Sequence, residues 1–250
     1  MPLKAVVSRR LYRGIADQLR QLIDNGVYPV GGRFPSEREL ADSLYVSRPS
    51  VREALIALEV EGLVRINVGS GIYVLRTSSS DPGRSSVEIP PEGPFEVLHA
   101  REIVESSVAA EAAALAGPQD IRMMDRILSR MEQCEGRNND WIALDREFHV
   151  MIAGILENGV PVRFIGEVFD LRINPYFERP ASYFEDANTW RQALAEHRLI
   201  RHAIAAGGAE SACSTMRDYL RCSQDRFSRG FGEPARPSTA AGRAPSVLCR

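Results

Sequence analysis

The chain has 250 residues, 44% of them hydrophobic and 7% aromatic, with 31 Lys and Arg against 33 Asp and Glu. This composition excludes collagen, coiled-coil rods and wholesale disorder. The sequence contains no apolar run of about 18 residues, the length that a membrane-spanning helix needs. The first 76 residues carry 11 basic and 8 acidic side chains, which gives +3 and leaves −5 for the rest. That asymmetry is typical of a nucleic-acid-binding head on an acidic body. The four cysteines form no C-x-x-C pair, so we expect a cytoplasmic protein.

Hydrophobic spacing with start and stop signals predicts three helices and then a hairpin, over residues 9–25, 36–44, 47–62 and 63–75. The second helix opens at Ser36, and Glu39 follows at the spacing of a capping box. The hairpin joins two short β-branched runs through the glycine-rich tip Asn-Val-Gly-Ser-Gly.

Three helices and a two-stranded wing form a winged helix-turn-helix, whose third helix enters the DNA major groove with its N-terminal end. Hydroxyls and guanidinium forks at that end suit phosphates and guanine edges, and glycines in the wing tip permit close approach. The predicted DNA-binding residues are Arg38, Ser47, Arg48, Ser50, Arg52, Gly69 and Gly71. The alternative for Arg48 and Arg52 is a solvated helix face.

The run PSERELADSLYVSRPSVREALIALEVEGLVRINVGSGIYV, from Pro35 to Val74, resembles the DNA-binding domain of the GntR family of bacterial transcription regulators. The resemblance includes the SERELA start, with Phe34 for the usual Leu, the VSRxxVREAL helix, the LxxxGLV turn and the GxGxxV wing. It implies a homodimer whose two heads bind a short palindromic operator in double-stranded DNA.

Residues 77–94 are rich in Ser, Pro and Gly and read as a linker, and residues 230–250 read as a disordered tail. The body between them, 95–229, is predicted to be helical throughout, over residues 95–116, 118–135, 139–157, 161–173, 188–206 and 209–228. The expected fold is therefore mainly α: a winged helix-turn-helix with a small β-hairpin wing in residues 1–76, then an all-α antiparallel bundle.

Asp145 and His149 stand four residues apart in DREFH, so both side chains lie on one helix face, as two metal ligands would. His197 lies in a later amphipathic segment, EHRLIRHAI. Without further information, each histidine is more often a core residue than a ligand. These residues alone leave metal binding open.

Residues 95–228 resemble the FCD ligand-binding domain of the FadR subgroup, through VLHAREIVE, DREFHVMIAGILENG and EHRLIRHAIAAGGAESACSTMRDYL. The resemblance implies a divalent metal (Zn, Ni or Mn) held by Asp145, His149 and His197. Tyr219 stands where the family's further histidine is expected, and it either ligates weakly or hydrogen-bonds the effector. Two histidines and one carboxylate still suffice for a metal with open positions.

Arg101 matches the family arginine of R-x-x-x-E, which grips a carboxylate, although a salt bridge with Glu105 is the alternative. Arg172 and Asn174, in VFDLRINPYF, add polar groups in a stretch similar to the hexuronate-responsive members of the subgroup. The predicted effector is a small carboxylate, either a sugar acid or a hydroxy acid, bound by Arg101, Arg172, Asn174 and Tyr219.

These expectations describe a ligand-responsive DNA-binding transcription regulator and not an enzyme: a repressor of a catabolic operon that its effector releases. A constitutive DNA-binding regulator without effector is the first alternative. The second is a metal-dependent enzyme, because two histidines and a carboxylate also form the facial triad of non-haem iron oxygenases. Those triads sit typically on β-barrels, whereas this body reads as all-helical.

Overall fold

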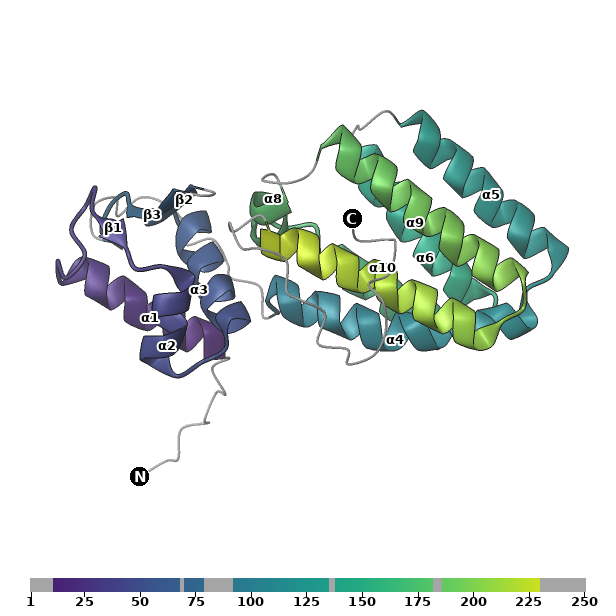
Figure 1. Cartoon of the computed structure of the whole chain (residues 1–250), viewed down its shortest axis with the longest axis horizontal. Coiled ribbons are helices and arrows are strands. Elements are labelled where there is room, and N and C mark those ends of the chain that lie inside the picture. The colour runs from purple at the N-terminus through teal and green to yellow at the C-terminus, as the bar shows by residue number, and fades with distance from the viewer. Residues whose placement is uncertain (1–10, 68–69, 79–91, 135–137, 182–185, 230–250) are drawn as a thin grey trace, which may run out of the picture. The chain divides into compact units, whose positions relative to one another are not determined.

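A computed structural model describes residues 11–67, 70–78, 92–134, 138–181 and 186–229 (Figure 1). Gly69, most of the predicted linker and the predicted tail lie outside the described residues. The chain divides into two compact units, which comprise residues 1–95 with 175–180, and residues 96–174 with 181–250. Within the described part, no helix is long and apolar enough to cross a membrane.

The first unit contains the predicted three helices and a small sheet: α1 (Leu11–Asp24), β1 (Arg33–Phe34), α2 (Glu37–Leu44), α3 (Arg48–Val60), β2 (Val64–Asn67) and β3 (Gly71–Val74). Helices α1 and α3 pack against each other through buried apolar side chains such as Leu19 and Leu55. The capping box is confirmed, because Ser36 Oγ accepts from the backbone N–H of Glu39 and the Ser36 N–H donates to the Glu39 carboxylate. It fixes where α2 begins.

The wing is a three-stranded antiparallel sheet in the order β1-β3-β2. Ile66 pairs with Ile72 across β2 and β3, which confirms the predicted hairpin, and Arg33 of β1 pairs with Tyr73 on the other edge of β3. The sequence did not predict β1, because a strand of two residues is too short to show an alternating pattern.

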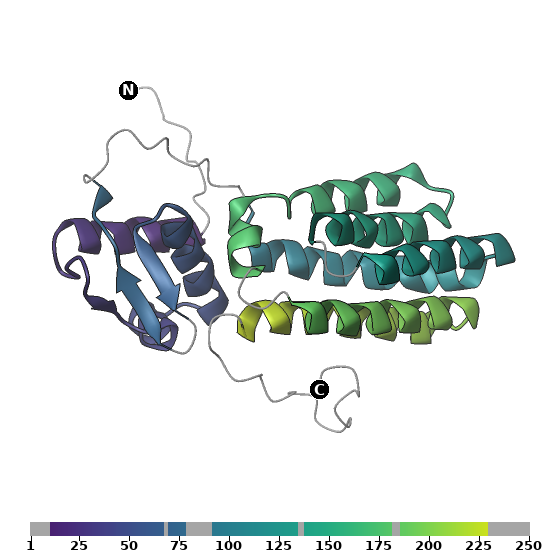
Figure 2. The ribbon, with the colours of Figure 1, turned by 90° about the horizontal axis from the view of Figure 1, so that it is seen from above.

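The described body is helical, as predicted, with α4 (Pro94–Leu115), α5 (Pro118–Gln133), α6 (Asn138–Gly154), α7 (Gly159–Asp170), α8 (Pro175–Ala181), α9 (Ala187–Ala205) and α10 (Ala209–Arg229). In Figure 2 the long helices run side by side, and α9 packs on α10 and α5 while α6 packs on α5 and α7. Phe148, Ile200 and Leu220 are fully buried in the core between them. Helix α8, whose residues 175–180 belong to the first compact unit, was not predicted, because seven residues with a proline near each end show no helical periodicity.

Candidate functional sites

The N-terminal end of α3 presents polar side chains at the surface of the head. Ser47 is the N-cap, and its hydroxyl accepts from the backbone N–H of Ser50 at 3.3 Å. The two hydroxyls lie 2.8 Å apart, and the Arg48 side chain next to them is 43% exposed. Arg38 on α2 is also exposed. Four of the predicted DNA-binding residues are thus at or near the surface around the start of α3.

Arg52 lies elsewhere: its side chain is 3% exposed and forms a two-pronged ion pair with Glu37 of α2. Arg52 Nε lies 2.8 Å from Glu37 Oε2 and Nη2 lies 2.7 Å from Oε1, while the guanidinium sits over the ring of Phe95. We expected Arg48 and Arg52 to face the same groove, but Arg52 is one turn further along, where α2 covers α3. The geometry gives Arg52 a packing role that joins α2 to α3.

In the wing, Gly71 is the first residue of β3 and has φ 119°, a conformation that L side chains rarely adopt. A Cβ there would lie 2.9 Å from Nε of Arg33. The backbone at Gly71 therefore favours glycine whether or not DNA approaches, and the other predicted wing residue, Gly69, lies outside the described residues.

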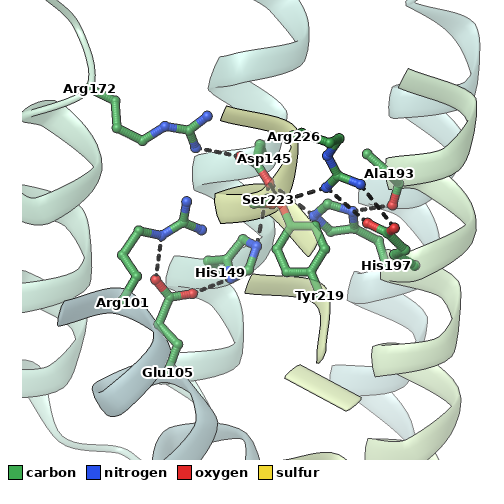
Figure 3. Close-up of polar contacts among 11 residues, drawn as sticks. Arg101, Glu105, Asp145, His149, Arg172, Ala193, His197, Tyr219, Ser223 and Arg226 are labelled. Atoms are coloured by element: carbon green, nitrogen blue, oxygen red, sulfur yellow. Dashed lines mark hydrogen bonds and ion pairs between the residues drawn. The ribbon is translucent and has the colours of Figure 1, made fainter. Parts of the chain in front are cut away.

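The second unit gathers polar side chains from five segments into its core (Figure 3). They are Arg101 and Glu105 of α4, Asp145 and His149 of α6, Arg172 after α7, His197 of α9, and Tyr219 and Arg226 of α10. The predicted trio of Asp145, His149 and His197 is buried, and one ligand atom from each lies within 4.8 Å of the others. The residues identified as possible metal ligands are thus brought together by two helices, α6 and α9.

Both imidazoles turn their Nε2 atoms toward one carboxylate oxygen, Oδ1 of Asp145. The distance is 2.9 Å from His197 and 3.4 Å from His149. The hydroxyl of Tyr219 donates to the same oxygen at 3.1 Å. Tyr219 stays protonated, because burial raises its pKa and the neighbouring Asp145 charge raises it further. In this structure Tyr219 therefore serves Asp145 as a hydrogen-bond donor.

In each histidine, the contact made by Nδ1 determines whether Nε2, the nitrogen facing Asp145, carries a proton or a lone pair. His197 Nδ1 lies 2.6 Å from the carbonyl oxygen of Ala193, which can only accept, so Nδ1 carries the proton. His149 Nδ1 contacts the carboxylate of Glu105 in an ion pair. In the neutral rings, both Nε2 atoms then present lone pairs to Asp145. A carboxylate behind a ligating histidine is the usual support for metal-binding imidazoles.

Opposite charges at this site shift several pKa values. Burial alone would raise the pKa of Glu105, but Arg101 and His149 outweigh it and lower that pKa to about 2. Burial would also raise the pKa of Asp145, but that pKa is well below its ordinary range, because the two imidazole rings facing it, when protonated, and the charge of Arg172 outweigh burial. The pKa of His149 is raised, since the two carboxylates outweigh the opposing effect of burial. Both carboxylates are therefore ionised near neutral pH.

Arg101 is 1% exposed and pairs with Glu105 through Nε at 2.7 Å, so the predicted alternative of a salt bridge is confirmed. Its guanidinium lies 3.9 Å from the centre of the Phe169 ring. Nη2, however, is buried without a hydrogen-bond partner among the described residues. A buried, charged N–H group without a hydrogen-bond acceptor destabilises the folded chain, unless a ligand supplies the acceptor.

A cavity opens beside Arg101 and Asp145, and further polar and aromatic side chains line it: Arg172, Arg226, Trp141, Trp190, Thr189, Tyr219 and Ser223. Arg172 Nη1 donates to Oδ2 of Asp145 at 2.8 Å. Asn174 does not line this cavity, because its amide donates to the carbonyl oxygen of Leu171 after α7.

The sequence predictions missed Arg226 and the two tryptophans. Arg226 follows Tyr219 by seven residues, a helical spacing that could have revealed it. It makes two 3.0 Å hydrogen bonds to the carboxylate of Glu196 and a third to Ser223. Trp141 and Trp190, the chain's only tryptophans, lie with ring centres 5.1 Å apart. The cavity therefore combines aromatic surface, hydroxyls and three guanidinium groups.

Comparisons with known proteins match both units. Residues 11–74 match the family described as bacterial regulatory proteins, gntR family, and residues 96–221 match the FCD domain. The chain is 40% identical to the Uxu operon regulator of Haemophilus influenzae, across 86% of this chain and 80% of that protein. It is 35% identical to the Exu regulon transcriptional regulator of Escherichia coli K12, across 85% of this chain and 82% of that protein.

Among solved structures, E. coli McbR/YncC matches with a TM-score of 0.50 and 17% identity, across 90% of this chain and all of that one, which supports the fold alone. The two family matches fall on the winged head and on the helical second unit, respectively. The chain therefore belongs to the GntR family of bacterial regulatory proteins, with an FCD domain as its C-terminal unit, and it is a regulator rather than an enzyme.

Proposed function

We propose that this protein is a ligand-responsive DNA-binding transcription regulator, a homodimeric repressor of a catabolic operon that a sugar acid or hydroxy acid releases from its operator. The observation that carries the sensor function is Arg101, a buried guanidinium with an unpartnered Nη2, beside a cavity in the unit that follows a winged helix-turn-helix. The operon regulators to which the chain is similar support a catabolic role.

For DNA, the proposal assigns Arg38, Ser47, Arg48 and Ser50, around the start of α3, to the interface. A helix N-terminus attracts phosphate, and an exposed guanidinium can hold guanine O6 and N7 with two hydrogen bonds. Arg52 is left out because Glu37 already occupies its guanidinium. One head offers few contacts, so two heads on a palindrome supply the affinity.

For the effector, the proposal uses the charge of the cavity wall. Arg101, Arg172 and Arg226 line it, but Arg172 bonds Asp145 and Arg226 bonds Glu196. Arg101 has the buried nitrogen without a partner, so a carboxylate accepting from Nη2 would satisfy it. Thr189 and Ser223 offer hydroxyls, and the tryptophans offer apolar faces, which suits a carboxylate that carries hydroxyl groups.

The donor set fits a divalent metal. Asp145, His149 and His197 would hold Zn, Ni or Mn through one carboxylate and two Nε2 lone pairs, with Glu105 and the Ala193 carbonyl fixing the rings from behind. When bound, the ion would supply a Lewis-acid contact for an oxygen of the effector. Tyr219 would hold Asp145 by its hydrogen bond.

Release of DNA then follows from linkage. The effector shifts the regulator only if it binds the DNA-free arrangement of the dimer more tightly than the DNA-bound one. Arg101 lies on α4, which begins at Pro94 directly after the linker, so a shift of its guanidinium acts on the helix nearest to the head in the chain. A constitutive regulator would show no such coupling.

The test is DNA binding with and without candidate acids. The full chain first selects a duplex from a random-sequence library, and fluorescence anisotropy then measures its affinity. We expect galacturonate, gluconate or L-lactate to weaken binding, while galactose, which lacks the carboxylate, does not. Arg101→Lys should weaken the response and Arg122→Lys, at an exposed position, should not. No response to any acid would favour the constitutive alternative.

A further inference from the structure

Tyr45 stands out on the head because a large aromatic side chain is almost entirely in water. It is 95% exposed, more than any other large hydrophobic residue in the described part of the chain. Its side chain makes no hydrogen bond or ring contact there. Packing within the described structure therefore gives no reason for an aromatic residue at this position.

The backbone conformation at Tyr45 is one that disfavours a large side chain. Tyr45 is the C-cap of α2 with φ 54° and ψ 41°, in the left-handed region. That conformation lets the N–H groups of both Tyr45 and Val46 reach the carbonyl oxygen of Ala41. Glycine or asparagine is the usual residue there, because a Cβ with further substituents is strained. A strained, exposed tyrosine suggests that its side chain contacts another molecule and has no role in packing within the chain.

The position of Tyr45 indicates what it meets. It lies in the turn between α2 and α3, two residues before the N-cap Ser47 and three before the exposed Arg48. In a helix-turn-helix, the start of the recognition helix reaches the base edges while the preceding helix crosses the phosphate backbone. The turn between them lies at the edge of the groove, where tyrosine hydroxyls commonly bond phosphate oxygens.

We propose that Tyr45 contacts DNA and that its hydroxyl donates a hydrogen bond to a phosphate oxygen at the edge of the groove entered by α3. This inference rests on α3 being the recognition helix, as proposed above. Because the donor is neutral, the contact releases no counterion, so it adds affinity without steepening the salt dependence. A phosphate contact also carries no sequence information.

The experiment compares Tyr45→Phe, Tyr45→Asn and Arg48→Ala in the full chain, on the selected duplex and on a scrambled duplex of the same composition. Tyr45→Phe removes only the hydroxyl and should weaken binding about 2- to 10-fold on both duplexes, with an unchanged salt slope. Tyr45→Asn should weaken binding at least as much while its Tm stays equal or rises, because asparagine tolerates the left-handed backbone.

Arg48→Ala is the control for the recognition helix, and it should reduce binding to the selected duplex more than to the scrambled one. Wild-type affinity of Tyr45→Phe together with loss in Arg48→Ala would overturn the Tyr45 contact alone. Wild-type affinity in both variants would instead show that the proposed α3 interface is wrong. A Tm lowered by Tyr45→Asn would also overturn the inference, since tyrosine would then be needed for folding.

Discussion

Nε2 of His197 lies 2.9 Å from Oδ1 of Asp145, while the opposite ring nitrogen of His197 donates to the backbone of Ala193. With its proton on Nδ1, a neutral His197 presents a lone pair to an ionised carboxylate. Two acceptors at this distance repel each other unless a cation lies between them. A second proton on the ring or a metal ion would meet that need, and the second imidazole of His149 on the same oxygen favours a metal.

Metal content is the first prediction. Protein purified without a histidine tag should bind about one Zn, Ni or Mn per chain, and a chelator that removes it should lower the Tm. His149→Ala should abolish stoichiometric binding in elemental analysis and titration. His99→Ala, which removes an exposed imidazole, should bind as the wild type does. Equal metal content in the two variants would contradict the assignment, and no uptake by the wild type would leave a metal-free effector site.

Tyr219 gives a second, sharper prediction about the same site. Tyr219→Phe removes the hydroxyl that donates to Asp145 and should weaken metal binding about tenfold, as loss of a supporting hydrogen bond does. Tyr219→His should tighten metal binding, because it adds an imidazole at the position of the family's further histidine. Competition with a chelator of known affinity measures both. Tighter binding by Tyr219→Phe would show that the hydroxyl does not support Asp145.

Arg52 and Arg48 should separate stability from DNA recognition. Arg52→Met leaves Glu37 buried without its bidentate partner and should destabilise the head by about 3 kcal/mol. Circular dichroism in urea measures this. Tryptophan fluorescence would not report on the head, because both tryptophans lie in the other unit. Arg48→Ala should change the unfolding curve little, since its ion pair with Glu37 is long, at 3.5 Å, and its side chain is 43% exposed.

The double variant Glu37→Leu with Arg52→Met tests the cause of that loss. Removing both charges leaves no uncompensated buried ion, so much of the stability should return. If the double variant is less stable than Arg52→Met, the ion pair is not the reason for the loss.

The lowered pKa of Glu105 predicts an acid-sensitive body. The pKa of its carboxyl is about 2 in the folded chain, against an ordinary value of 4.5. Its contribution to stability is therefore present above pH 4.5 and is lost as the pH falls toward 2. His149 adds no slope below pH 5, because its raised pKa keeps it protonated there in the folded chain, and it is also protonated when unfolded. In metal-free protein, Glu105→Gln should make the free energy of unfolding fall less steeply between pH 5 and pH 3. An unchanged slope would contradict the pairing with Arg101.

Local sequence signals predicted the head well, because its elements begin and end on contacts a few residues apart. Ser36 with Glu39 fixes the start of α2, and Ser47 caps α3, as the spacing indicated. The spacing of Asp145 and His149 placed both on one helix face for the same reason. These contacts require no knowledge of how the helices pack.

Tertiary structure decided which charges are satisfied within the chain and which are left for a ligand. Arg48 and Arg52 carry the same side chain one turn apart, and both lie near Glu37. The packing of α2 on α3 buries Arg52 in two short hydrogen bonds to that carboxylate, whereas Arg48 lies 3.5 Å from it and stays 43% exposed. Arg101 pairs with Glu105 as its own helix allows, but its unpartnered Nη2 arises from how α6, α7 and α10 enclose it. Helical periodicity fixes the face of a side chain, whereas its partner depends on segments far along the chain, which no local pattern records.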